Sequence, residues 1–258
     1  MLLTIEVGNT NTVFGLCDRA GRGRVAAYRL STVRERMPDE WFADLTTLAA
    51  VDGHALNGLE GVILSSVVPS VTTSLAEMAE RRLGTGPLVV TPALDLGIAL
   101  LVDEPRQLGA DRLVDCVAAK AKYGGPAIIV DLGTATTFDV IDGDGNLVGG
   151  SIAAGVQTSL KALAGNAAQL FNVELRQPDG PIGKNTADQL RIGLVLGHQL
   201  MLEGMIRRIH ADLGTDAPTI LTGGLAPLFA GRSPLFTHTD PDLTLDGLRI
   251  IWEMLRGA

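Results

Sequence analysis

The chain opens with two apolar runs joined by a short stretch of small polar residues. The first run ends at Glu6 and Val7, the stretch Gly8-Asn9-Thr10-Asn11-Thr12 follows, and the second run begins at Val13. Glycine and small polar residues between apolar runs favour a tight turn between two strands. Such a turn can present backbone N–H groups, with Thr and Asn donors, to a phosphate.

The same pattern returns near the middle of the chain. In the stretch Asp131-Leu132-Gly133-Thr134-Ala135, Asp131 corresponds to Glu6 and Gly133 corresponds to Gly8. The two stretches lie nearly half of the 258 residues apart, which favours two related halves. We expect two phosphate-binding turns that face each other across a central cleft.

The remaining apolar pattern alternates between strand-like and helix-like periods. For the first half it predicts strand 25–30, helix 38–50, strand 61–67, helix 69–83, strand 88–90 and helix 109–123. For the second half it predicts strands 127–131, 136–141 and 147–152, helix 154–163, a long helix 186–213, strand 218–222 and a closing helix 243–255. This order predicts a duplicated actin-like α/β fold with mostly parallel sheets.

Glycine and proline mark the expected boundary between the halves. Gly124-Gly125-Pro126 ends the preceding helical pattern, so we predict domains 1–123 and 124–258, the latter with the long helix and an adenosine-binding region. A GxGxxA pattern at Gly21 to Ala26 precedes a strand rather than a helix, and therefore does not indicate a dinucleotide site.

Composition and charge exclude several classes of protein. The net charge is −8 and no Lys/Arg run stands out, so a basic nucleic-acid surface is not expected. No apolar run approaches the roughly 20 residues that span a bilayer, and the N-terminus lacks a basic leader. We expect a cytoplasmic protein without nucleic-acid or membrane partners. Cys17 and Cys116 lack the spacing of a zinc site.

Four short segments are candidates for a chemical role, and they contain Gly109, Gly183, Glu6 and Asp131. Gly109-Ala110-Asp111-Arg112 places a carboxylate and a guanidinium at a helix start. Asp111 is a candidate base for an alcohol, or alternatively a partner of the helix dipole with Arg112 on the surface. Gly183-Lys184 is not a P-loop, and Thr186 is a candidate helix cap. Glu6 and Asp131 could hold Mg²⁺ beside a triphosphate.

Taken together, these segments resemble the type III pantothenate kinases, the Bvg accessory factor family. The matching segments occur in the family's order over nearly the whole chain: Glu6 to Thr10, Gly109 to Arg112, Asp131 to Thr136, Gly183 to Thr186, Thr222 to Gly224 and Asp240 to Leu248. The resemblance implies an acetate and sugar kinase/actin-type fold, usually a homodimer. Its members phosphorylate pantothenate with ATP in the first step of coenzyme A synthesis.

The resemblance also implies roles for individual residues. ATP would contact Glu6, Val7, Gly8, Asn9, Thr10, Asn11, Thr12, Val13 and Thr134. Pantothenate would contact Gly109, Ala110, Asp111, Arg112 and Thr186. In the dimer, Thr186 of one chain would lie near the acceptor site of the other chain. Asp111 would be the general base, Asp131 would hold a monovalent cation (K⁺ or NH₄⁺), and Mg²⁺, with Glu6 as a possible ligand, would accompany the nucleotide.

Three positions depart from the family pattern. Glu6 stands where the family has Asp, Val102 stands where Tyr is frequent, and Asp115 stands where Asn is frequent. An extra methylene at Glu6 could shift the phosphates by about 1 Å, which can slow a transfer roughly 100-fold. Two alternatives therefore stay open: a kinase of the same fold for another small alcohol, and a non-catalytic accessory or regulatory paralogue.

Overall fold

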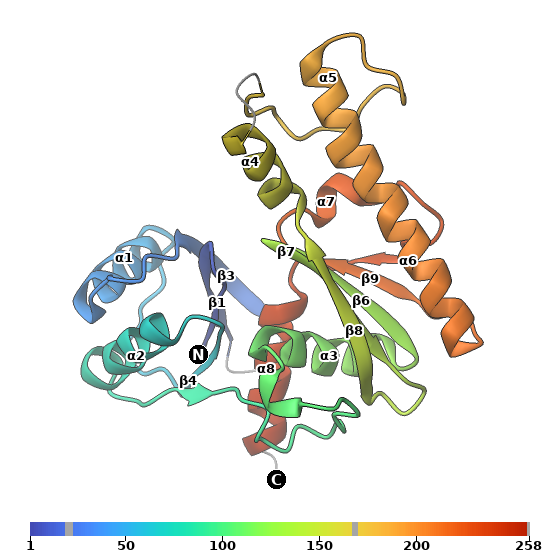
Figure 1. Ribbon diagram of the computed structural model, residues 1–258. Coiled ribbons are helices and arrows are strands. Elements are labelled where there is room, and N and C mark those ends of the chain that lie inside the picture. Colours follow the sequence, from blue (N-terminus) through green and yellow to red (C-terminus); the bar gives the residue numbers. More distant parts are fainter. Residues whose placement is uncertain (19–22, 167–169, 257–258) are drawn as a thin grey trace. The chain divides into compact units, whose positions relative to one another are not determined.

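The structure is a computed structural model that describes residues 1–18, 23–166 and 170–256 (Figure 1). The chain divides into two compact units. Unit 1 contains residues 1–122 together with the C-terminal segment that begins at Leu243, and unit 2 contains Tyr123–Asp242. No helix among the described residues is both long and apolar enough to cross a membrane.

Unit 1 is built on a five-stranded mixed sheet. Its strands are β1 (Leu2–Val7), β2 (Asn11–Cys17), β3 (Arg24–Ser31), β4 (Gly61–Ser66) and β5 (Leu88–Val89), in the spatial order β3-β2-β1-β4-β5. The first three strands form an antiparallel meander, whereas β4 and β5 extend the sheet in parallel with β1. The long apolar runs of β1 and β4 suit strands that are covered on both faces.

Helices cover both faces of this sheet. They are α1 (Pro38–Val51), α2 (Pro69–Met78, continued by a π-helical turn Ala79–Leu83), α3 (Ala110–Tyr123) and α8 (Leu243–Arg256), with a short 3₁₀ turn at Pro105–Gln107. Side chains at alternate positions of β1 serve different cores. Leu3 and Ile5 pack with α1 and α2, whereas Leu2 shares a core with α3 and α8. Glu6 therefore lies on the α3 and α8 face of the sheet.

Unit 2 repeats the same arrangement. Its strands are β6 (Ala127–Leu132), β7 (Ala135–Ile141), β8 (Leu147–Ala154), β9 (Thr219–Thr222) and β10 (His238–Thr239), in the order β8-β7-β6-β9-β10. Its helices are α4 (Val156–Asn166), α5 (Thr186–Arg191), a π-helical turn (Ile192–Leu196), α6 (Gly197–Leu213) and α7 (Ala226–Phe229). The matching strand orders confirm the prediction of a duplicated α/β fold. The prediction of mostly parallel sheets is wrong, because the first three strands of each sheet form an antiparallel meander.

The element bounds agree closely with the sequence pattern, with three differences. The predicted long helix is interrupted by the π-helical turn between α5 and α6, and the pattern does not reveal α7 or β10. Gly21 and Arg22 of the GxGxxA pattern lie outside the described residues. The segment that follows them, Arg24–Ser31, is a strand as expected.

The closing helix requires a correction to the predicted domains. The sequence order assigned it to the second half, but α8 belongs to unit 1. The physical reason is its apolar face, since Leu245, Leu248 and Ile251 are buried in the core that also contains Leu2 and Leu113. Unit 2 is consequently a continuous segment inserted between two parts of unit 1.

Candidate functional site

The first candidate feature is the turn between β1 and β2. The N–H of Gly8 donates to the carbonyl of Asn11 across 2.9 Å and closes the turn. Asn9 and Thr10 at its tip are exposed. The turn thus has the small, open form that the sequence predicts for a phosphate-binding segment.

Strand pairing places four residues in one row across the sheet of unit 1. Glu6 pairs with Val13 of β2, and Val13 pairs with Arg29 of β3. On the other side, Glu6 pairs with Ser65 of β4. Directly paired residues point to the same face of a sheet, so Arg29, Glu6 and Ser65 share the face that α3 and α8 cover.

The carboxyl group of Glu6 is strongly influenced by its surroundings. Burial raises the pKa of Glu6 to about 7, the positive charge of Arg29 opposes that rise, and the negative charge of Asp111 adds to it. The residue therefore changes charge close to neutral pH. Asp111 and Arg29 are thus close enough to Glu6 to affect its charge. The predicted base and the acid beside the predicted phosphate turn therefore share one local environment in unit 1.

Asp111 lies in the first turn of α3. Its Oδ1 accepts a hydrogen bond from the N–H of Arg112 across 2.8 Å, which fixes the orientation of the carboxylate. A side chain at position 109 would meet this Oδ1 at 2.5 Å and would lie near Val67 just beyond β4. Gly109 therefore provides the space in which the Asp111 carboxylate sits.

Asp115 lies one helical turn after Asp111 and is 3% exposed. Its Oδ1 accepts a hydrogen bond of 2.7 Å from the hydroxyl of Thr244 in α8. The carboxylate that stands where the family frequently has Asn thus accepts a hydrogen bond at the start of α8, where negative charge is stabilised. Val102, the other departure, is half-buried.

In unit 2, Asp131 is close to the end of β6 and pairs with Thr222 of β9. A side chain at position 223 would collide with the Asp131 carboxylate and with the backbone of Leu132, and Gly223 adopts a φ of +84°. Both observations require glycine at position 223. Gly223 thereby keeps open the space that the predicted cation ligand occupies.

The carbonyl of Thr134, in the turn after β6, is held by two donors. It accepts from the N–H of Gly155 across 3.2 Å and from the hydroxyl of Thr158 across 2.6 Å. Gly155 packs so closely on this turn that a side chain there would meet the carbonyl of Gly133. The second predicted phosphate turn is therefore fixed by Gly155, which joins β8 to α4, and by Thr158 in α4.

Thr186 is the first residue of α5 and is exposed. The predicted cap is wrong by one residue, because Asn185 is the N-cap and its side chain accepts from the N–H of Asp188 across 2.9 Å. Asn185 has extended backbone angles, as an N-cap requires, whereas Thr186 is already helical. The hydroxyl of Thr186 is accordingly not needed to cap the helix.

The chain is similar to known proteins over nearly its whole length. Residues 2–208 match the family model of type III pantothenate kinase. A type III pantothenate kinase from Thermomicrobium roseum is 47% identical over 255 residues, covering 99% of this chain and 98% of the relative. One from Moorella thermoacetica is 44% identical, covering 98% and 99%. The chain belongs to the type III pantothenate kinase family.

Solved structures bear out the fold of this family member. A Baf family protein from Campylobacter jejuni superposes with a TM-score of 0.63 at 18% identity, covering 99% of this chain and all of that one. The activator of 2-hydroxyisocaproyl-CoA dehydratase from Clostridium difficile, solved with bound ADPNP, has a TM-score of 0.53 at 11% identity, covering 99% and 96%. The actin-like kinase fold predicted from the sequence is confirmed.

The donor groups in this pantothenate kinase family member suit a nucleotide with Mg²⁺. The described parts of the chain contain no cluster of three or more His, Cys, Asp or Glu side chains able to hold a metal. Mg²⁺ in kinases usually needs only one or two carboxylates, because phosphates and waters complete its coordination. Glu6 in unit 1 fits that requirement, and the Asp131 carboxylate in unit 2 offers the hard oxygen donor that a monovalent cation prefers.

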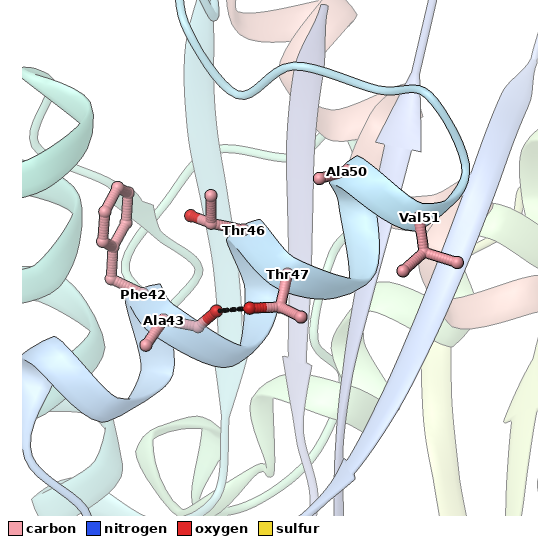
Figure 2. A pocket seen from close by; sticks show the side chains of 6 residues that line it. All are labelled: Phe42, Ala43, Thr46, Thr47, Ala50 and Val51. Atoms are coloured by element: carbon pink, nitrogen blue, oxygen red, sulfur yellow. Dashed lines mark hydrogen bonds between the residues drawn. The ribbon is translucent and has the colours of Figure 1, made fainter.

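A shallow surface hollow on α1 is a different kind of feature (Figure 2). Its lining consists of apolar and hydroxyl side chains, namely Phe42, Ala43, Thr46, Thr47, Ala50 and Val51. The Thr47 hydroxyl is turned back to the carbonyl of Ala43 at 2.7 Å. None of these six lining residues is charged, and none is a predicted site residue.

The sequence pattern did not single out three residues that the structure brings to this site. Arg29 and Ser65 join the row of Glu6 through strand pairing, and Thr32 contacts the β1–β2 turn. No motif marks any of them. Only the exact pairing of β3 and β4 with their neighbours could have identified Arg29 and Ser65.

Proposed function

We propose that this chain transfers the γ-phosphoryl group of ATP to pantothenate. The observation that carries the proposal is the local environment shared by Glu6, beside the phosphate turn, and Asp111 at the start of α3. In a member of the type III pantothenate kinase family, these are the groups that a phosphoryl donor and an alcohol acceptor require.

The β1–β2 turn, from Glu6 to Val13, would hold the phosphates of ATP through backbone N–H groups and its Asn and Thr side chains. Arg29, on the same sheet face as Glu6, would offset the negative charge that two carboxylates and a triphosphate bring together. Mg²⁺, when bound with ATP, would supply further positive charge to the transferring phosphoryl group.

Asp111 would act as the general base. As the acceptor hydroxyl oxygen forms its bond to the γ-phosphorus and the bond to the β–γ bridging oxygen breaks, the hydroxyl proton would pass to the carboxylate. Since Oδ1 accepts from the N–H of Arg112, Oδ2 is the oxygen assigned to this proton. Gly109, Ala110 and Arg112 would contact the acceptor beside it.

Unit 2 would contribute Thr134 to the nucleotide and Asp131 to a monovalent cation, K⁺ or NH₄⁺. The second turn supports this assignment because its backbone is fixed by Gly155 and Thr158. Dependence of turnover on added K⁺, and its loss in Asp131→Ala, would test the cation. Equal turnover in K⁺ and in Na⁺ would argue against it.

A coupled assay for ADP release tests the main proposal with pantothenate, ATP, Mg²⁺ and K⁺ as the mixture. We expect turnover by the unmodified chain and a loss of at least about 100-fold in Asp111→Asn. Asp103→Asn, at an exposed carboxylate outside α3, is the matched control. Full turnover by Asp111→Asn with a single phosphorylated product would remove Asp111 as the base.

The same assay, together with a measurement of ATP binding, separates the alternatives raised by Glu6, Val102 and Asp115. Faster phosphorylation of another small alcohol than of pantothenate would identify a different acceptor. Binding of ATP without any transfer, in both the unmodified chain and Glu6→Asp, would identify a non-catalytic relative. A gain of turnover in Glu6→Asp would instead show that Glu6 slows an otherwise complete enzyme.

We propose that the active form of the chain is a homodimer and that it acts in the cytoplasm. Ile182 before α5 is 85% exposed and Leu200 of α6 is 58% exposed, so the segment near Thr186 presents apolar side chains that a second copy could cover. Light scattering should then give twice the mass of one chain. Leu200→Glu should yield monomers that have lost pantothenate turnover if Thr186 serves the partner's site.

A further inference from the structure

Thr32, the first residue after β3, makes three hydrogen bonds to the β1–β2 turn and its border. Its N–H donates to the carbonyl of Thr10 across 2.9 Å. Its hydroxyl donates to the carbonyl of Gly8 across 2.8 Å and lies 3.0 Å from the hydroxyl of Thr12. Because the single hydroxyl proton of Thr32 is directed to Gly8, Thr12 is the donor in the last contact.

These contacts determine which way the turn's peptide groups point. In a planar trans peptide, the C=O of one residue and the N–H of the next point in opposite directions. Thr32 attracts the carbonyls of Gly8 and Thr10, so the N–H groups of Asn9 and Asn11 are directed away from Thr32. Carbonyl oxygens repel a phosphate whereas N–H groups attract it.

Unit 2 has a comparable arrangement at the corresponding place. Gly155 is likewise the first residue after the third strand, β8, and its N–H donates to the carbonyl of Thr134 in the β6–β7 turn. A hydroxyl, from Thr158, adds a second bond to the same carbonyl. In both units, therefore, the segment after the third strand binds carbonyl groups of the turn.

We propose that Thr32 is a positioning residue for the polyphosphate of the nucleotide. By holding the carbonyls of Gly8 and Thr10, Thr32 directs the backbone N–H groups of Asn9 and Asn11 to the bound phosphates. The inference rests on the proposed function for the identity of the reaction, but the class of ligand it names, a nucleoside triphosphate, can be tested by binding alone. Thr32 itself touches the turn rather than the substrate.

Thr32→Val tests this inference because it removes the hydroxyl while keeping the side-chain shape and the backbone N–H. Thr32→Ser keeps the hydroxyl and serves as the rescue variant. Thr4→Val is the matched control, since the Thr4 hydroxyl also donates to a glycine carbonyl of the same sheet, that of Gly15 at 3.2 Å. Calorimetric binding of a non-hydrolysable ATP analogue with Mg²⁺ is measured beside the KM for each substrate and the melting temperature.

We expect Thr32→Val to weaken binding of the analogue and to raise the KM for ATP by about tenfold, as the loss of one orienting hydrogen bond would. The KM for pantothenate should stay within about twofold, and Thr32→Ser should bind the analogue nearly as the unmodified chain does. Thr4→Val should lower the melting temperature at least as much as Thr32→Val without weakening nucleotide binding.

The result separates the two proposals. If the unmodified chain does not phosphorylate pantothenate but Thr32→Val still binds the analogue more weakly, the proposed function is wrong and the role of Thr32 is supported. Unchanged analogue binding by Thr32→Val, or equal weakening in Thr4→Val, would overturn the role of Thr32 even if pantothenate is the substrate. Absence of analogue binding by the unmodified chain would overturn it as well.

Discussion

Ser65 lies directly opposite Glu6 in the parallel pair formed by β1 and β4. Unit 2 repeats the relationship, because Thr222 lies opposite Asp131 in the parallel pair of β6 and β9. Each unit thus places a buried hydroxyl residue beside the acid that is the second-to-last residue of its first strand. Ser65 is 1% exposed and Thr222 is equally buried, so neither hydroxyl contacts bulk water.

The two adjacent serines of β4 should respond differently to replacement by alanine. The Oγ of Ser65 is buried and has no hydrogen-bond partner among the residues that the structure describes. Removing such a group is neutral or stabilises by about 1 kcal/mol. Ser66 Oγ accepts from the N–H of Val68 and from the hydroxyl of Thr72. Ser66→Ala should therefore lower the free energy of unfolding by about 1–2 kcal/mol. Urea denaturation measures both variants, and a larger loss in Ser65→Ala would contradict the expectation.

Glu6 should make the stability of the fold depend on pH. Because burial raises its pKa from 4.5 to about 7, the folded state holds the proton more tightly than the unfolded state does. The associated stabilisation is complete below about pH 4.5 and is lost as the pH rises through 7. The shift corresponds to about 3 kcal/mol at most.

Glu6→Gln should remove this dependence. Its free energy of unfolding should exceed that of the unmodified chain by more at pH 8 than at pH 5, as measured by urea denaturation at both values. Glu77→Gln, at an exposed carboxylate that pairs with Arg81, is the control and should show no such widening. A difference that is constant over this pH range would mean that Glu6 is not the responsible group.

Gly223 and Gly224 offer a matched pair of alanine substitutions. At Gly223 the added methyl group would meet the Asp131 carboxylate and the Leu132 backbone, and the φ of +84° is itself strained for alanine. At Gly224 no atom of the described part of the chain lies within 4 Å of the added group. We expect Gly223→Ala to lose at least about 2 kcal/mol of stability and Gly224→Ala to lose less than about 1 kcal/mol. Calorimetric melting curves give both values.

The buried Asp115 should tolerate asparagine better than alanine. Asp115→Asn keeps a side-chain oxygen that can still accept from the Thr244 hydroxyl, so stability should change by less than about 1 kcal/mol and turnover should persist. Asp115→Ala would leave the Thr244 hydroxyl without this acceptor and should lose about 1–3 kcal/mol. Urea denaturation of both variants measures the difference, and equal losses would show that the Thr244 contact contributes little.

The elements of the fold were largely predictable because apolar periodicity is a local property. Helix α1 begins at Pro38 in both the prediction and the structure, and β4 begins at Gly61 in both. The acid, glycine and threonine pattern likewise identified both turns. These features depend only on residues that are close together in the sequence.

The remaining features depend on which segments meet in space. Arg29 becomes a neighbour of Glu6 only through the pairing of β3 with β2 and of β2 with β1, and a shift by one residue would turn it to the other face. The cap at Asn185 was missed because Thr186 is also a capping residue type. Backbone geometry at the helix start, rather than composition, decides between them.

The position of α8 affects the order in which the chain can fold during synthesis. Strand β1 leaves the ribosome before unit 2, but the core on its α3 face contains Leu245 and Leu248 of α8, which follows unit 2 in the sequence. Unit 2, a continuous segment, is complete before that helix is made. Synthesis of unit 1 therefore begins before that of unit 2 and ends after it. Until α8 is made, this apolar face of the unit 1 sheet is only partly covered, and we expect newly made chains to need protection from aggregation there.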